Sequence, residues 1–254
     1  MRIFKAELFK LISLPTIWLA LALGLLVPAA VGAITSVTAL DGITGGTETG
    51  VGVDAGYQEL AFGVMGVIIL GVAAVSSEYF TESEESGGGR QITASLTAIP
   101  SRLGFLLAKA AAVALVSMLL AAAACAVTMT VLRIILGEYF TVPGAGDLPR
   151  LAGVICYWVL TALLAFGLTV LTRQSVIPLA VLITNTSVVT VTYLLTRITP
   201  LANYFPDMAG IRMFIHQVPD TNVEISPLAG GMVMTAWAAA LLLASAVAFL
   251  RRDS

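Results

Sequence analysis

Six long apolar blocks alternate with short polar segments along the chain, and this pattern predicts the main elements. An α-helix rises about 1.5 Å per residue, so about 20 apolar residues cross the hydrocarbon layer of a membrane. We therefore predict an all-α, polytopic membrane protein that forms a single transmembrane domain over residues 1–254. The six predicted transmembrane helices lie at about 15–40, 57–77, 105–136, 151–172, 175–196 and 227–250.

The first 14 residues predict a short amphipathic helix before the first span. The apolar face would consist of Phe4, Leu8, Leu11 and Ile12, and the polar face of Arg2, Lys5, Glu7 and Lys10. Such a helix lies in the membrane interface with its apolar side at the acyl boundary. The alternative is a simple basic flank of the first span.

The segment 77–102 is the largest piece between spans on its side of the membrane. It contains an acidic run and three consecutive glycines, followed by an apolar stripe of Ile92, Leu96 and Ile99 that Pro100 ends. The spacing i, i+4, i+7 predicts one apolar face on a short helix. This face would either insert into a groove on a partner protein or rest on the membrane or the protein's own bundle.

Three prolines divide the loop 197–226 into short pieces, and residues 207–217 are predicted to form a helix. The Met, Phe and Ile content is too apolar for a loop surrounded by water. We expect it to rest on the ends of the bundle or to enter the membrane as a re-entrant segment, which is permitted where protein shields the backbone.

Composition agrees with a lipid-covered surface, because 58% of the residues are hydrophobic and 11% are charged. Soluble domains average about 45–50% apolar and about 25% charged residues. A soluble enzyme with one membrane anchor is therefore excluded, and no basic run suggests nucleic acid. Nine Lys and Arg residues fall on the side of the N-terminus, the 78–104 segment, the 173 turn and the C-terminus, against four on the other side. This bias predicts that both termini are cytoplasmic.

The sequence contains no recognisable motif for catalysis or metal binding, so we expect no catalytic and no metal site. The motifs HExxH, GxSxG and GxxxxGK[ST] are absent, and both cysteines lie inside apolar blocks as packing residues. Two alternatives to transport remain open. One is a membrane-embedded hydrolase that uses His216, Asp207 or Glu224, and the other is a non-transporting immunity protein that binds a peptide.

Polar side chains within the spans gather in the fifth block. One side of its helical wheel carries Thr186, Ser187, Thr190, Tyr193 and Arg197. Hydroxyl groups in this arrangement either line a path for an amphipathic solute or form interhelical hydrogen bonds.

Several of these features in their order resemble the ABC-type-two permeases, the membrane subunits of bacterial exporters. They are KAELFKL before the first span, Glu78 in SSEYF, Leu96 to Pro100, a basic pair (Arg102, Lys109), PDMAG at 206–210 and RRDS after the last span. The acidic and glycine residues at 81–89 depart from the usual pattern of that family.

The resemblance implies a permease subunit of an exporter of drugs, antibiotics, antimicrobial peptides or lipids in the bacterial cytoplasmic membrane. It implies a homodimer or heterodimer of permeases with two copies of a separate ATPase, which would bind the ATP and Mg²⁺. Residues 1–14 would be an interfacial elbow, 91–99 a coupling helix and 200–217 a re-entrant piece. The expected coupling residues are Glu78, Arg90, Ile92, Leu96, Ile99 and Pro100, and the fifth-span stripe would border the substrate path.

Overall fold

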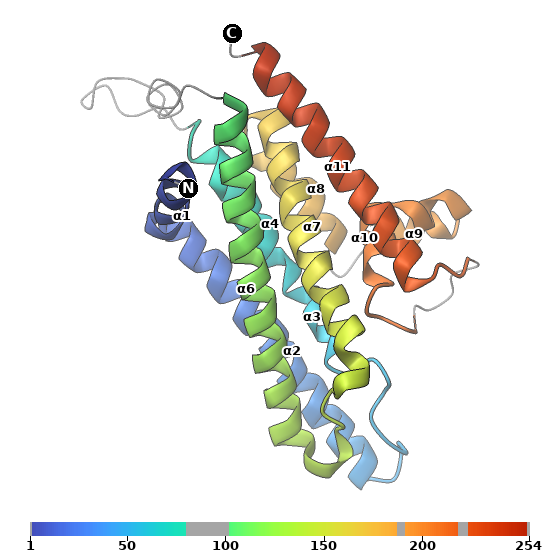
Figure 1. Ribbon diagram of the computed structural model, residues 1–254. Helices are drawn as coiled ribbons and strands as arrows, with labels where there is room; N and C mark the ends of the chain where they lie inside the picture. The colour runs from blue at the N-terminus through green and yellow to red at the C-terminus, as the bar shows by residue number, and fades with distance from the viewer. Residues whose placement is uncertain (1, 80–101, 187–190, 218–222, 253–254) are drawn as a thin grey trace.

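The computed structural model describes residues 2–79, 102–186, 191–217 and 223–252, and every regular element in these ranges is helical (Figure 1). Within them, five helices are long and apolar enough to cross a membrane: Pro15–Thr44, Tyr57–Ser76, Arg102–Tyr139, Ala145–Thr172 and Pro227–Arg251. The prediction of an all-helical, multi-pass membrane protein is therefore confirmed.

The described helices are, in chain order, α1 (Arg2–Ser13), α2 (Pro15–Thr44), α3 (Tyr57–Phe62), α4 (Val64–Ser76), α6 (Arg102–Leu136), α7 (Leu148–Thr172), α8 (Val176–Thr186), α9 (Val191–Thr196), α10 (Pro206–Ile211) and α11 (Pro227–Arg252). Short 3₁₀ turns cover Gly137–Tyr139, Ala145–Asp147 and Pro200–Tyr204. With 35 residues, α6 measures roughly 50 Å, longer than the ~30 Å hydrocarbon layer.

The second span is the centre of the bundle. In its most apolar stretch 72% of the residues are buried, against 22% in α11 and 28% in α2. Helix α4 packs between α2 and α7, and α11 packs on the other side of α7. The outer helices therefore leave most of their apolar surface exposed, as a surface that faces lipid requires.

Glycines bring the central helices into backbone contact. A Cβ atom on Gly66 would lie 2.5 Å from the carbonyl oxygen of Ala20 on α2. A Cβ atom on Gly71 would lie 2.3 Å from the carbonyl oxygen of Ala162 on α7. Both distances are too short for any side chain, so glycine at these positions sets the spacing of α2, α4 and α7.

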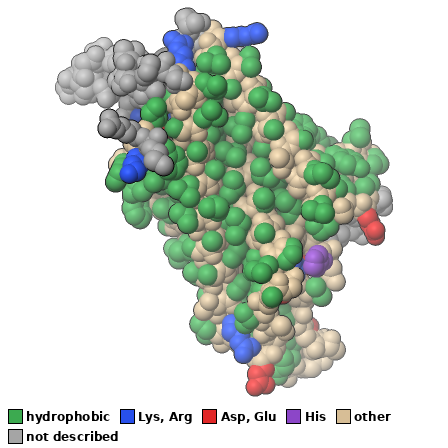
Figure 2. Space-filling view, viewed as in Figure 1, with side chains coloured by type: hydrophobic (Ala, Val, Ile, Leu, Met, Phe, Trp, Pro, Cys, Tyr) green, Lys and Arg blue, Asp and Glu red, His purple; other side chains and the backbone are tan. Residues whose placement is uncertain are grey.

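Both termini lie at one end of the bundle, here called the terminal end, where α6 also begins (Figure 1). The opposite end, here called the far end, holds the loops around 45–56 and 137–147. Figure 2 shows that most basic side chains on this face lie toward the two ends, with hydrophobic side chains over the middle.

The predicted fifth span is the least regular of the six. The structure describes two shorter helices in this block, α8 and α9, on either side of residues 187–190, which lie outside the described residues. Among the described helices, α8 is apolar but too short to count as a span. A sixth crossing therefore stays a prediction.

The predicted helix at 207–217 is wrong beyond Ile211, where α10 ends. The reason is that other segments take the backbone groups that a longer helix would need. Arg150 donates to the carbonyl oxygen of Phe214, and the amides of His216 and Gln217 donate to Asp54.

The predicted division of the first helix into two faces is wrong at one residue. Glu7 was expected on the polar face, but it is buried against the bundle together with Leu11. Two large apolar residues of α1 are exposed, Ile12, which was expected on the apolar face, and Phe9, which was not. Glu7 is buried because a lysine of α6 faces it, as described next.

Candidate functional site at the terminal end

Four buried or half-buried charged residues meet where α1, α6 and the end of α4 converge at the terminal end. The Lys109 ammonium on α6 donates to Glu78 Oε1 at 2.9 Å and forms an ion pair with Glu7 on α1. Lys10 on α1 donates to the same Glu78 oxygen. Two carboxylates and two ammonium groups therefore form a cluster with no net charge.

This ionic cluster, defined as Glu7, Lys10, Glu78 and Lys109, is shielded from water. The side chains of Glu78 and Lys109 are 2% and 4% exposed, whereas Lys10 at 22% lies at the rim. Burial raises the pKa of Glu78, but the charges and hydrogen bonds of Lys109 and Lys10 outweigh it and hold the pKa below its ordinary value. Glu78 is therefore ionised at neutral pH, and the pairs persist as charges.

The cluster also borders the turn between α7 and α8. Tyr79 follows Glu78, and the Arg173 guanidinium lies over its ring at 5.9 Å from the ring centroid. Arg173 ends α7 in a left-handed conformation, φ 55°, which turns the chain toward α8. Polar contacts therefore join α1, α6 and the 173 turn to the last described residues before the segment 80–101.

A second group of buried polar contacts lies at the far end and centres on the ion pair of Asp54 and Arg150. Arg150 donates to the Asp54 carboxylate and to the carbonyl oxygens of Val53 and Phe214, and its guanidinium stacks 3.6 Å from the Tyr57 ring centroid.

The Asp54 carboxylate accepts, in addition, the backbone N–H of His216 at 3.0 Å and that of Gln217 at 2.7 Å. The loop before α3, the start of α7 and the chain after α10 are thereby held together by one buried ion pair.

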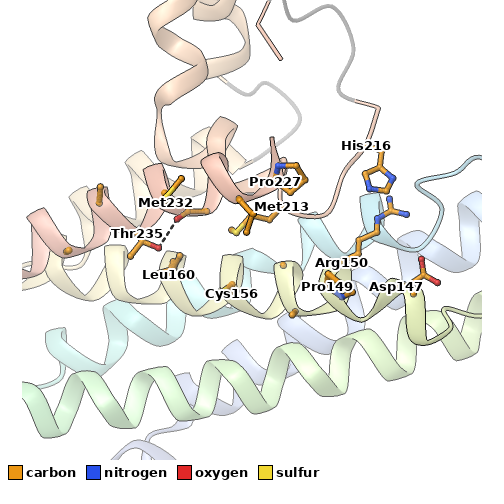
Figure 3. A pocket seen from close by; sticks show the side chains of 17 residues that line it. Asp147, Pro149, Arg150, Cys156, Leu160, Met213, His216, Pro227, Met232 and Thr235 are labelled. Carbon is orange, nitrogen blue, oxygen red and sulfur yellow. Dashed lines mark hydrogen bonds between the residues drawn. The ribbon is translucent and has the colours of Figure 1, made fainter. Parts of the chain in front are cut away.

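A cavity of about 950 Å³ lies between α7 and α11 (Figure 3). Small and apolar side chains line most of it, among them Cys156 and Leu160 on α7 and Met232 on α11. Arg150 and His216 lie together at one end. The cavity therefore combines an apolar body with one polar end.

The predicted substrate-path residues are only partly described. Thr186 donates its hydroxyl to the carbonyl oxygen of Leu182 in its own helix, at 2.9 Å. Arg197 donates to the Tyr193 hydroxyl at 3.0 Å, so these two members of the stripe lie together. Ser187 and Thr190 lie outside the described residues, and the role of the stripe stays a prediction.

Of the predicted coupling residues, Glu78 belongs to the ionic cluster. The others, Arg90, Ile92, Leu96, Ile99 and Pro100, lie outside the described residues. The three residues considered for a hydrolase lie in different environments. His216 lines the cavity between α7 and α11 and Glu224 is exposed, whereas the Asp207 carboxyl is buried.

Sequence reasoning missed the pairing of Glu7, Lys10 and Lys109 with Glu78. One signal was available, because Lys109 lies inside the apolar block predicted to span the membrane. An ionisable group at such a position needs a partner. The acidic residue at the end of the preceding span and the Glu7–Lys10 pair on the first helix were the nearest candidates in the sequence.

No family model matches the chain, and no curated protein or solved structure matches it either.

Proposed function

We propose that this chain is the permease subunit of an ATP-driven exporter of the ABC type, which moves an amphipathic or hydrophobic compound outward across the bacterial cytoplasmic membrane. A separate ATPase, present in two copies, would bind ATP and Mg²⁺ and supply the energy. A second permease, identical or related, would complete the transporter.

The observation that carries this proposal is the ionic cluster at the terminal end. Glu78 lies two residues before the segment 80–101, which is outside the described residues and connects in sequence to Arg102, the first residue of α6. A force applied to this segment reaches α1, α4 and α6 together, because separating them would leave charges buried without partners. Such a loss costs about 3–5 kcal/mol.

The proposed membrane arrangement has six crossings, with α8 and α9 together forming the fifth. The terminal end would face the cytoplasm, as the excess of Lys and Arg on that side favours. Helix α1 would be the interfacial elbow, since Phe9 and Ile12 are exposed to the lipid side while Glu7 and Leu11 face the bundle. The chain from Pro200 to Gln217 would be the outer re-entrant piece.

The proposed amphipathic cargo is supported by the cavity between α7 and α11. Binding sites for small molecules commonly have volumes of about 300–1,000 Å³, mostly apolar walls and few polar groups. The cavity of about 950 Å³ with Arg150 and His216 at one end has this character. An apolar compound with one polar end fits such a lining better than a sugar or an inorganic ion.

Co-purification tests the proposal. The tagged chain is extracted from native membranes in mild detergent, and the proteins bound to it are identified by mass spectrometry. We expect an ATPase with a nucleotide-binding P-loop in stoichiometric amount with the unaltered chain. It should be lost from the double variant Ile92→Asp, Leu96→Asp and retained by Ala94→Asp, which alters the opposite face of the predicted coupling helix. Extraction without any ATPase in several mild detergents would contradict the proposal.

A further inference from the structure

Asp207, the second residue of α10, differs from the other buried carboxylates of the described chain. Three of those, Glu7, Asp54 and Glu78, form ion pairs with Lys or Arg. A fourth, Glu59, accepts the Thr35 hydroxyl and the Gly56 N–H. Both carboxyl oxygens of Asp207 are buried, yet among the described residues neither has a hydrogen-bond partner of ordinary geometry and no cation lies within ion-pair distance.

Two polar side chains of α8 and α9, those of Asn185 and Thr192, lie beside this carboxyl. Asn185 near the end of α8 accepts the N–H of Thr192 at 3.1 Å and its hydroxyl at 2.8 Å, and thereby joins α8 to α9. Both side chains lie close enough to Asp207 to influence its charge. Asp207 therefore lies beside the hydrogen-bonded pair Asn185 and Thr192, here called the α8–α9 junction.

Among the described residues, the charged and titratable groups on the elements around α10 form no ion pair with Asp207. On α7, the Tyr157 side chain is buried near it. Directly after α9, Arg197 donates to the hydroxyl of Tyr193, and directly after α10, Arg212 donates to Asn203. On the 3₁₀ turn Pro200–Tyr204, Tyr204 is half-exposed, and α11 has no ionisable side chain before Arg251.

Burying an ionised carboxylate in such surroundings costs more free energy than burying a neutral carboxylic acid. Burial raises the pKa of Asp207 above its ordinary value, against smaller opposing effects of Thr192, the Met208 amide and Asn185. Helix α10 has only six residues, so its helix dipole stabilises a negative charge weakly.

We propose that Asp207 is a proton-binding site: its carboxyl is neutral while α10 lies against the α8–α9 junction, and it ionises only when this contact opens. Proton binding and opening are then linked, so that proton release favours the open arrangement. The inference concerns the chain itself and does not depend on the transport proposal.

The direction of the pH effect follows from this linkage. A carboxyl whose pKa is higher in the folded than in the unfolded state binds more protons when folded. Its contribution to stability is fully present below the unfolded pKa of about 3.9 and is lost as the pH rises through the folded pKa. The contact between α10 and the α8–α9 junction should therefore weaken toward alkaline pH.

Infrared spectroscopy of the full chain in lipid nanodiscs tests the protonation directly. At pH 7 we expect a carboxylic acid C=O band that Asp207→Asn abolishes and that Asp147→Asn, at a half-exposed carboxylate, leaves in place. If Asp207→Asn does not fold, Asp207→Glu should shift the frequency of this band. A spectrum that neither substitution at Asp207 alters would overturn the proposal.

Hydrogen exchange tests the opening. Between pH 6 and pH 9 the exchange rates of the amides of residues 207–211 should rise by more than the ordinary factor of about ten per pH unit in the unaltered chain. In Asp207→Asn they should rise by only this ordinary factor. Equal pH dependence in the two proteins would contradict the link between proton release and opening.

Discussion

Replacing Lys109 by Met removes a cation that contacts both carboxylates of the ionic cluster. Met keeps a long apolar side chain, so the main change is electrostatic. Glu7 then loses its ion pair with Lys109, and Glu78 loses one of the two lysines of the cluster that contact it. Because these carboxylates remain buried, the cluster acquires a net negative charge out of water, and we expect a loss of about 3–5 kcal/mol in the free energy of unfolding.

Two control substitutions separate this effect from a general loss of charge. Lys10→Met removes a cation at the rim of the cluster, where exposure to water reduces the ion pair to about 1 kcal/mol or less. Lys5→Met alters an exposed residue of the same helix and should change nothing measurable. The order of the losses should be Lys109, then Lys10, then Lys5.

A double variant tests whether the loss comes from the unpaired charge. Adding Glu7→Gln to Lys109→Met restores neutrality, and the double variant should be more stable than the sum of the two single losses by about 0.5–3 kcal/mol. The assay is reversible unfolding in mixed micelles, followed by tryptophan fluorescence. Additive losses, or a loss for Lys109→Met no greater than for Lys10→Met, would refute the reasoning.

Three further predictions follow from the far end, the glycine contacts and the pH dependence of the cluster. Asp54→Asn should raise the hydrogen-exchange rates of the amides at 216–217 at least tenfold, because both donate to this carboxylate; unchanged rates would contradict the assignment. Gly71→Ala should destabilise the bundle by about 1–3 kcal/mol in the same unfolding assay, whereas Gly146→Ala, where a Cβ atom meets nothing within 4 Å, should not. The lowered pKa of Glu78 means that its stabilising effect is present above about pH 4.3 and is lost as the pH falls through the folded pKa, so Glu78→Gln should flatten the stability profile between about pH 5 and pH 3.

The long apolar helices were predictable because hydrocarbon thickness fixes their length, and five of the six predicted blocks correspond to candidate spans. The fifth block was harder to interpret, since its polar residues serve local structure. Asn185 holds α8 to α9, which a hydropathy pattern does not reveal. The helix at 207–217 was predicted too long because its end depends on hydrogen bonds to Asp54 and Arg150, which lie far away in the sequence.

The candidate site was only partly predictable for the same reason. Glu78 could be chosen from the resemblance, but its partners come from α1 and α6, 68 and 31 residues away. Helical periodicity placed Glu7 on the polar face of α1. It describes one helix at a time and carries no information about the helices that pack against it. The facing charge of Lys109 determines where Glu7 lies, and this pairing appears only when the helices are assembled.

Site-specific photocrosslinking in native membranes tests the central claim most directly. A photoreactive amino acid is placed at Leu96, in the predicted coupling helix, and in a separate variant at Thr47, in the far-end loop. Our account predicts that position 96 crosslinks to a protein with a nucleotide-binding P-loop and that position 47 does not. Crosslinks from position 96 to lipid or to the chain itself alone would contradict the assignment as an ATPase-driven permease.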